Sequence, residues 1–165
     1  MSKLYVDEIH PKIVGGDTRI MKPVTFYFTH NTTVTVPDAN ETVMPFDKNV
    51  FDTHGFYDSA NDRPKVPTGY AGYYQINWQG AITMAGTGDN VFARLRKNGS
   101  GVQLMYAYFN GAEGERWTFT GSTILDLDEG DYLDVTLFCD RASGSSTSLG
   151  NNQTSFINGF MIGAK

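Results

Sequence analysis

Short runs of apolar residues fill most of the chain after residue 23, either alternating with polar residues or rich in β-branched and aromatic ones. Pro, Gly, Asn and Asp separate these runs at short intervals, and no apolar period of 3.6 residues persists over a helix-sized stretch. The pattern predicts an all-β domain, a two-sheet antiparallel sandwich. The predicted strands are VTFYFTH, TTVTV, GYYQINWQGAITM, VFARLRKNG, VQLMYAYFNG, RWTFTGSTILDL, DYLDVTLFCD and TSFINGFMIG.

One long segment, residues 42–76, departs from this pattern. Its apolar residues are spread among Pro, Asp, Asn and Gly, which break regular structure, so most of it is predicted to cross a surface without forming strands. It then passes through Pro67-Thr68-Gly69 and begins the strand GYYQINW, a connection expected in an antiparallel jelly roll. The side chains predicted to fix the segment by entering the core are Phe46, Val50, Phe51, Phe56, Tyr57 and Val66.

Several short motifs follow one another along the chain. They are Val43-x-Pro45-Phe46-Asp47, Phe51-Asp52, Tyr57-Asp58, Val66-Pro67, Gly72-Tyr73-Tyr74-Gln75-Ile76, then residues 94–99 (RLRKNG), 125–132 (LDLDEGDY) and 155–162 (SFINGFMI). In this order they resemble the C1q/TNF-like jelly-roll domain, and the resemblance covers the chain from about residue 23 to the C-terminus. It implies a jelly roll in which Lys97-Asn98-Gly99 forms a turn and Gly130-Asp131 leads into a strand.

The strands carry more aromatic residues than one small sandwich usually hides, with 11 Phe, 9 Tyr and 2 Trp in the chain. GYYQINW and LMYAYF place large side chains on both faces of their strands. In the C1q/TNF family a threefold interface covers the second face, so the resemblance implies a homotrimer. An exposed Tyr needs no partner because its hydroxyl tolerates solvent, but this does not apply to Phe92, Phe109 and Trp78, which are expected to need cover. The predicted core or trimer-interface residues are Phe46, Tyr57, Tyr73, Tyr74, Trp78, Phe92, Phe109 and Phe160.

Residues 1–22 are interpreted as a separate N-terminal arm, and residues 23–165 as the jelly-roll domain. A strand-like start is interrupted at Pro11 and at the pair Gly15-Gly16, and a piece this short cannot bury a core of its own. It is therefore expected to add a strand to another surface. The opening SKLYVDEIHPK resembles the N-terminal attachment segments of tailed-bacteriophage structural proteins, and a frayed terminus is the alternative. The predicted attachment residues are Leu4, Tyr5, Val6 and Ile9.

Composition and charge narrow the classes of function. Hydrophobic residues make up 40% of the chain and charged residues only 19%, which favours a globular domain over a disordered one. The net charge of −5 and the scattered basic residues argue against nucleic-acid binding. No apolar run approaches the ~20 residues that span a bilayer, and the N-terminus has no signal-peptide core, so neither membrane insertion nor classical secretion is expected. Cys139, the single cysteine, is predicted to be a buried strand residue.

Candidate chemistry is sparse. The three histidines, His10, His30 and His54, fall in separate predicted loops or termini without metal-ligand spacing. Carboxylates gather within residues 126–131, but the resemblance gives this Gly-Asp region a turn, so turn chemistry is favoured over a Ca²⁺ site. Asp residues within 47–62 are interpreted in the same way. We therefore predict no catalytic residue, no metal or other cofactor and no enzymatic activity.

Two roles compete for an acidic, trimeric β-module with an N-terminal arm. Tailed-phage virion proteins assemble in the bacterial cytoplasm, so the virion is the expected location. As a capsid decoration protein, the trimer would clamp the major capsid protein with its arms. As a short tail fibre or fibre head, it would join tail proteins and bind a host surface glycan or protein. The compact chain without a shaft favours decoration, and a carbohydrate-active enzyme or an unrelated binding module is the remaining alternative.

Overall fold

The computed structural model describes residues 23–84, 88–108, 114–141, 146–148 and 154–165. The predicted attachment residues Leu4, Tyr5, Val6 and Ile9, and also Phe109, lie outside these ranges. The described strands are β1 (Thr25–Thr29), β2 (Thr35–Val36), β3 (Thr42–Val43), β4 (Lys48–Asp52), β5 (Tyr57–Asp58), β6 (Arg63–Pro64), β7 (Gly72–Thr83), β8 (Gly88–Lys97), β9 (Ser100–Tyr108), β10 (Arg116–Leu127), β11 (Leu133–Arg141), β12 (Ser146–Ser148) and β13 (Phe156–Ala164).

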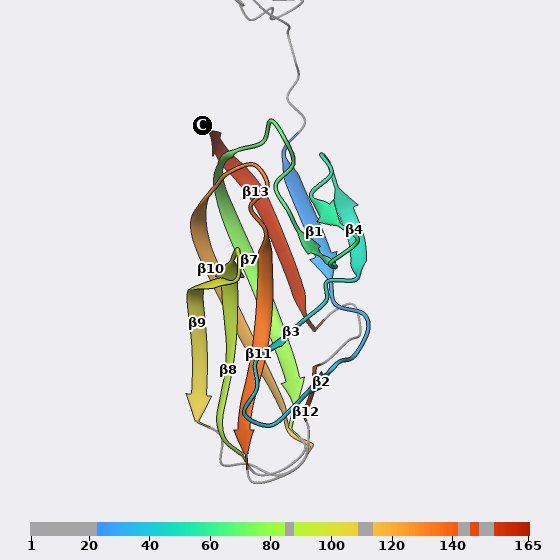
Figure 1. Ribbon diagram of the computed structural model, residues 1–165, viewed down its shortest axis with the longest axis vertical. Coiled ribbons are helices and arrows are strands. Elements are labelled where there is room, and N and C mark those ends of the chain that lie inside the picture. The colour runs from blue at the N-terminus through green and yellow to red at the C-terminus, as the bar shows by residue number, and fades with distance from the viewer. Residues whose placement is uncertain (1–22, 85–87, 109–113, 142–145, 149–153) are drawn as a thin grey trace, which may run out of the picture.

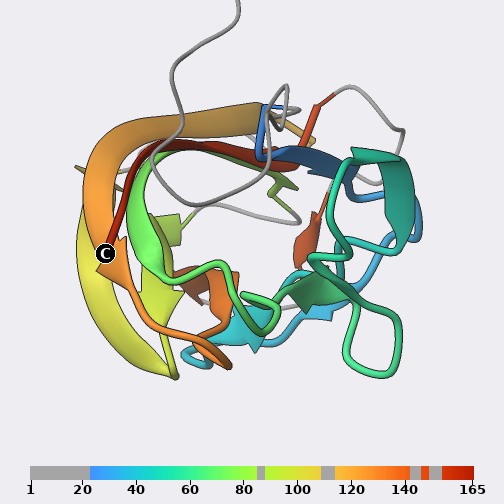
Figure 2. The same cartoon turned by 90° about the horizontal axis from the view of Figure 1, so that it is seen from above.

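Two antiparallel sheets pack face to face, which confirms the predicted all-β sandwich. A seven-stranded sheet has the order β2-β12-β7-β13-β1-β4, with β10 on the other side of β7. A four-stranded sheet has the order β3-β11-β8-β9, and β5 with β6 forms a small separate hairpin. Figure 1 shows the strands running along the long axis of the molecule, and Figure 2 shows the two sheets enclosing the interior. No helix in the described part of the chain is long and apolar enough to cross a membrane.

The longest strands organise the seven-stranded sheet. β7 pairs with β10 from Gly72 opposite Leu127 to Thr83 opposite Arg116, so the two strands match over their whole length. Gly72 itself meets the end of β13 closely, because a Cβ there would lie 2.5 Å from the carbonyl oxygen of Gly163. Gly72 therefore allows the two backbones to approach closely, as glycine does inside strands.

A two-residue turn joins β8 to β9. Asn98 and Gly99 both have positive φ, 52° and 78°, which suits a type I′ hairpin turn and the predicted Lys-Asn-Gly signal. The Asn98 side chain also ties the turn to the start of β11, because its Oδ1 accepts a hydrogen bond from the Tyr132 N–H at 3.0 Å. The turn is thus fixed by its own backbone preference and by the start of β11.

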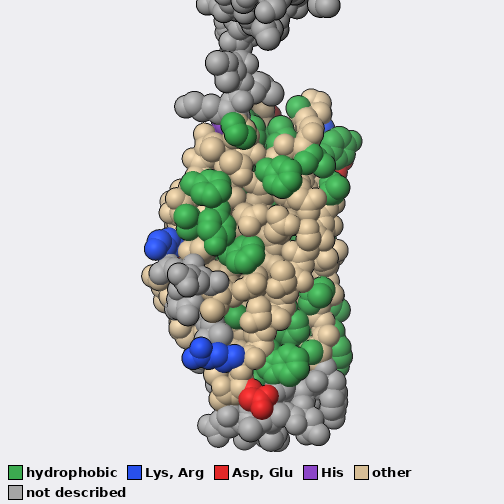
Figure 3. All heavy atoms as spheres, turned by 180° about the vertical axis from the view of Figure 1, so that it is seen from behind, with side chains coloured by type: hydrophobic (Ala, Val, Ile, Leu, Met, Phe, Trp, Pro, Cys, Tyr) green, Lys and Arg blue, Asp and Glu red, His purple; other side chains and the backbone are tan. Residues whose placement is uncertain are grey.

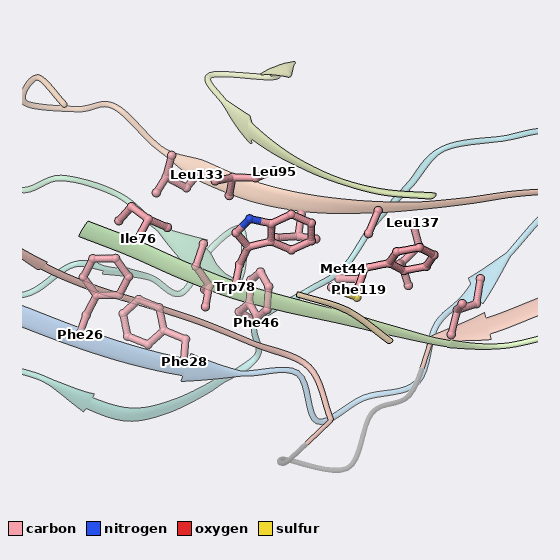
Figure 4. Close-up of a cluster of buried hydrophobic side chains, with 14 of the residues drawn as sticks. Phe26, Phe28, Met44, Phe46, Ile76, Trp78, Leu95, Phe119, Leu133 and Leu137 are labelled. Atoms are coloured by element: carbon pink, nitrogen blue, oxygen red, sulfur yellow. The ribbon is translucent and has the colours of Figure 1, made fainter. Parts of the chain in front are cut away.

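The core lies between the two sheets and is rich in aromatic rings. Phe26 stacks on Phe28 at 5.2 Å between ring centroids and on Phe56 at 5.1 Å. Figure 4 shows Trp78 near the middle of the buried cluster, with Leu95 on one side and Phe46 on the other. The strands of both sheets therefore meet at the Trp78 indole.

Gln103 and Gly121 complete the surroundings of Trp78. The indole Nε1–H donates a hydrogen bond to Gln103 Oε1 at 2.7 Å, so this fully buried side chain leaves no orphan donor. A Cβ at residue 121 would lie 2.3 Å from Nε1, which reserves that position for glycine. The prediction that Trp78 needs cover from a partner is wrong, because the sandwich and the Gln103 side chain already cover it.

The structure corrects the prediction for residues 42–76. Phe46, Phe56 and Val66 enter the core, but Val50 and Phe51 are 47% and 46% exposed. Both belong to β4, which pairs with β1, and Val50 lies where the register of that pair shifts. With β3, β5 and β6 also in this segment, more of it is strand than its breaker-rich sequence indicated.

Two other predicted boundaries are wrong. Of the predicted strand TTVTV, only Thr35–Val36 forms β2. The predicted strands leave out residues 142–153, yet Ser146–Ser148 forms β12 there, which pairs with both β2 and β7. Neither strand has a side-chain pattern of its own, since each is defined by its neighbours in the sheet. Cys139 is buried in β11 as predicted.

Candidate subunit interface

The seven-stranded sheet has one face in the core and one face turned outward. Tyr74, Ile76 and Trp78 of β7 point into the core, so the alternate residues of β7 point the other way. The cross-strand register extends this outward face over neighbouring strands. We call it the outer face: its apolar members are Tyr27, Phe51, Tyr73, Ile124, Phe156 and Phe160, and its polar members are Gln75, Asn77, Ser122 and Asn158.

Large apolar side chains are exposed along the outer face. Tyr73 is 46% exposed, Phe160 45% and Ile124 57%, and the register places Phe160 and Ile124 on either side of Gln75. Figure 3, the view from behind, shows hydrophobic side chains gathered in several groups with uncharged surface between them. Isolated apolar residues are normal on a surface, but a set of this extent on one sheet face indicates an interaction site.

Three aromatic rings form a cup at one side of the outer face. The Tyr27 ring lies 5.9 Å from Phe51 and 5.8 Å from Phe156, measured between centroids. Thr25, Phe26 and Asn158 complete a shallow hollow of about 250 Å³. The rings come from β4, β1 and β13, so three segments far apart in the sequence build it. Because it is open and mostly apolar, the cup suits an apolar side chain of a partner.

The polar members of the outer face form a hydrogen-bonded chain across three strands. Gln75 Nε2 donates to Ser122 Oγ at 2.6 Å, Ser122 Oγ donates to Asn77 Oδ1 at 2.8 Å, and Asn77 Nδ2 donates to Asn158 Oδ1 at 3.0 Å. Amide and hydroxyl groups that already form hydrogen bonds with one another cost less free energy to remove from water when a partner covers them. The chain therefore allows the middle of the outer face to be buried at modest cost.

The structure separates the predicted core or interface residues. Phe46, Tyr74 and Trp78 are fully buried within the sandwich, whereas Tyr73 and Phe160 lie on the outer face. The register of β13 against β7 brings Tyr73 and Phe160 into one surface although 86 residues separate them in the chain. The outer face is the place where a subunit contact predicted from these two residues would form.

Two predicted residues lie elsewhere. Phe92 is on the outward side of the four-stranded sheet, stacked on Phe138 at 4.5 Å with the Arg94 guanidinium 5.0 Å from its ring centroid. Tyr57 packs on the core at Phe28, 5.1 Å between centroids, and donates a hydrogen bond to Asp62 at 2.9 Å. Burial and the Asp62 carboxylate raise the pKa of Tyr57 to about 12, so this hydroxyl stays a donor at neutral pH.

Sequence reasoning missed several members of the outer face. Tyr27, Ile124 and Phe156 were treated only as strand residues, because the face of the sheet on which they lie depends on the strand register, which cannot be read from the sequence. The edge strand β9 also carries exposed Val102, Leu104 and Tyr106 at alternate positions. Alternation within GVQLMYAY was the available signal for that second set.

The carboxylates act as caps of turns. Asp52 accepts hydrogen bonds from three backbone N–H groups, including that of Tyr57 at 2.8 Å. Asp131 accepts from the Asp128 N–H at 2.7 Å and from Asn98 Nδ2 at 2.6 Å, and it pairs with Lys97. Among the described residues, no three His, Cys, Asp or Glu side chains gather in a way that could hold a metal ion.

The profile of the C1q domain matches residues 25–162, which is most of the chain. The chain belongs to the C1q family. Solved structures have the same fold. Eiger TNF from S. frugiperda is similar to this chain with a TM-score of 0.62 and 17% identity, over 87% of this chain and 94% of that one. The globular domain of zebrafish complement 1qA protein has a TM-score of 0.60 and 14% identity, over 87% and 100% of the two chains.

Murine APRIL at pH 5.0 is also similar, with a TM-score of 0.64 and 10% identity over 86% of this chain and 100% of that one. A search of the curated proteins gave no match. The C1q/TNF-like resemblance of the sequence motifs is therefore confirmed. C1q/TNF-like domains are typically ligand-binding or structural rather than enzymatic, and such folds commonly form homotrimers.

Proposed function

We propose that three copies of this C1q domain associate through the outer face into a homotrimer that serves a structural role. The observation that carries the proposal is the set of half-exposed apolar side chains on one sheet face, led by Tyr73, Ile124 and Phe160, in a domain whose family commonly forms trimers. An obligate interface of this kind is expected to bury more than about 2,000 Å² in total. Light scattering at micromolar concentration tests the assembly, since a stable folded monomer of 18.2 kDa would contradict it.

The trimer is further proposed to be a virion protein of a tailed bacteriophage that decorates the capsid. The support is the resemblance of SKLYVDEIHPK to phage attachment segments, together with a compact body. In this proposal the body forms the trimer, and residues 1–22 bind the major capsid protein by adding a strand to it. Three arms tethered to one body would multiply a weak contact through effective concentration.

A truncation separates the arm from the body. The described core begins after Pro23, so a chain starting at Met21 is expected to remain trimeric with a nearly unchanged melting temperature but to fail to bind capsids. The full chain with Leu4→Ser and Val6→Ser is a matched variant that keeps the length of the arm. Full capsid occupancy by the truncated trimer would contradict the anchoring role. Incorporation of the full chain into tails instead of heads would favour the fibre role.

A further inference from the structure

A histidine that the sequence places in a turn is fully buried. His30 follows β1 and is 0% exposed. Its Nδ1 lies 2.7 Å from the Pro45 carbonyl oxygen, and its Nε2 lies 2.7 Å from Ser148 Oγ. The ring therefore connects the end of β1 with the segment after β3 and with β12. In Figure 1, β2 and β12 lie toward the end of the sandwich opposite the C-terminus.

The partners of the ring fix its tautomer. A carbonyl oxygen can only accept, so Nδ1 carries the proton and donates it to Pro45. Nε2 is then the acceptor, and the Ser148 hydroxyl donates to it. The Ser148 Oγ in turn accepts from the Val34 N–H at 2.9 Å. Every group in this circuit is satisfied while the imidazole is neutral.

The same circuit holds a small edge element. Ser148 N–H donates to the Val34 carbonyl oxygen at 2.9 Å, and β12 pairs with β2 through Ser146 opposite Val36. We call residues 34–36 and 146–148 the edge flap. Strands of two and three residues supply little pairing, and β12 joins β7 only through Thr147 opposite Thr83 and Ser148 opposite Ile82, so the flap depends on contacts such as the one to His30.

A positive charge on the His30 ring would meet few groups able to neutralise it. Burial lowers the pKa of His30, although the hydrogen bond to Pro45 and the charge of Asp47 oppose this. Asp47 is committed to the Asn31 and Thr32 N–H groups, at 2.6 and 3.0 Å, and neither β2 nor β12 carries an ionisable side chain. A proton on Nε2 would also turn the Ser148 hydroxyl toward the Val34 oxygen at 3.4 Å, a weaker bond.

We propose that His30 is an acid-sensitive latch: its protonation in mild acid releases the edge flap while the rest of the sandwich stays folded. The closed form holds a neutral ring, whereas in the open form the ring meets water and has an ordinary pKa of about 6.5. The open form therefore binds more protons, and the closed form loses stability as pH falls below about 6.5. Burial opposes it, but hydrogen bonds from Thr32 and Asn31 lower the pKa of Asp47, so its stabilising effect is lost only as pH falls below about its ordinary value of 3.8, and the two windows are separate.

A built-in probe lies under the flap. Cys139 is the single cysteine of the chain and is 0% exposed, with its Sγ 3.8 Å from the Val36 carbonyl oxygen. Movement of β2 away from β11 would bring this thiol into contact with solvent. Its rate of modification, divided at each pH by the rate for the urea-unfolded chain, measures how often the flap opens.

The test uses the full chain and dithiodipyridine, a disulfide that reacts with thiols in mild acid. Between pH 7.5 and 5.0 the normalised rate of Cys139 is expected to rise by up to about thirtyfold, the factor for one proton gained at an ordinary pKa. His30→Gln should remove this rise, and His54→Gln, a half-buried histidine at the surface, should keep it. A rate that stays constant, or an equal rise in His30→Gln, would overturn the latch.

A second measurement does not depend on a variant that folds. Ring ¹⁵N shifts of the wild-type chain should show His30 neutral and protonated on Nδ1 at pH 6.5. They should also show flap amides losing protection from exchange at pH 5.0 before those of β7 and β10. A charged His30 at pH 6.5, or equal loss of protection in all strands, would contradict the proposal.

Discussion

Replacing Phe160 by serine tests the outer face directly. Phe160 is 45% exposed in the subunit, and its backbone keeps the β13–β7 pairing whatever the side chain is. A large aromatic side chain buries about 150–250 Å². Covering the exposed share in a trimer therefore removes about 90 Å² per subunit from water, or about 2 kcal/mol at ~25 cal/mol per Å².

Three subunits lose this contribution together, so Phe160→Ser should weaken the trimer by about 6 kcal/mol, or about 10⁴-fold in the association constant. The concentration at half dissociation varies as the square root of that constant and should rise about a hundredfold. Sedimentation velocity over a dilution series measures it. Val43→Ser is the matched control, because Val43 is also 45% exposed but lies on the other sheet. Equal behaviour of the two variants would refute the assignment of the interface.

Three further predictions concern the fold. Tyr74→Ala should lower the free energy of unfolding by about 3–5 kcal/mol in urea titrations, because the ring is fully buried, and an unchanged midpoint would contradict its place in the core. Gly121→Ala should cost about 1–3 kcal/mol in the same assay, since its Cβ meets the Trp78 indole, and Gly163→Ala, where a Cβ reaches only an ordinary contact 3.8 Å from the Tyr73 ring, controls for backbone entropy. Burial raises the pKa of Asp131, but hydrogen bonds from Lys97 and Asn98 lower it by more, so the ionised carboxylate should stabilise the fold above about pH 4 and lose this effect below. Asp131→Asn should therefore flatten the acid part of the curve of unfolding free energy against pH.

The strands that the sequence predicted best are those whose side chains alternate over many residues. GYYQINWQGAIT became β7 and RWTFTGSTILDL became β10 because a long period-2 pattern leaves one register in which the core is filled. The turn at Asn98-Gly99 was also readable, since its backbone demands residues that tolerate positive φ. Local chemistry sufficed in each of these places.

The positions that the sequence did not reveal depend on distant partners. Phe51 reads like a core residue, yet it faces outward because β4 pairs with β1 at a bulge. Trp78 looked like a surplus aromatic, but its cover comes from Gln103 on β9 and from the absence of a Cβ at residue 121. His30 next to a turn signal gave no sign of burial, because Pro45 and Ser148 approach it only in the folded sheet. Register and long-range packing decide all three.

The hydrogen-bonded chain on the outer face has a consequence for how this sequence can change over generations. Hydrogen bonds run from Gln75 to Ser122, from Ser122 to Asn77 and from Asn77 to Asn158, so the replacement of one residue would leave a donor or acceptor of its neighbour unpaired once the proposed trimer covers the outer face. Single substitutions should therefore be selected against, while joint substitutions that restore the chain should persist. Among diverging relatives, these four positions on β7, β10 and β13 are expected to vary as one unit and to keep subunits of different lineages from mixing.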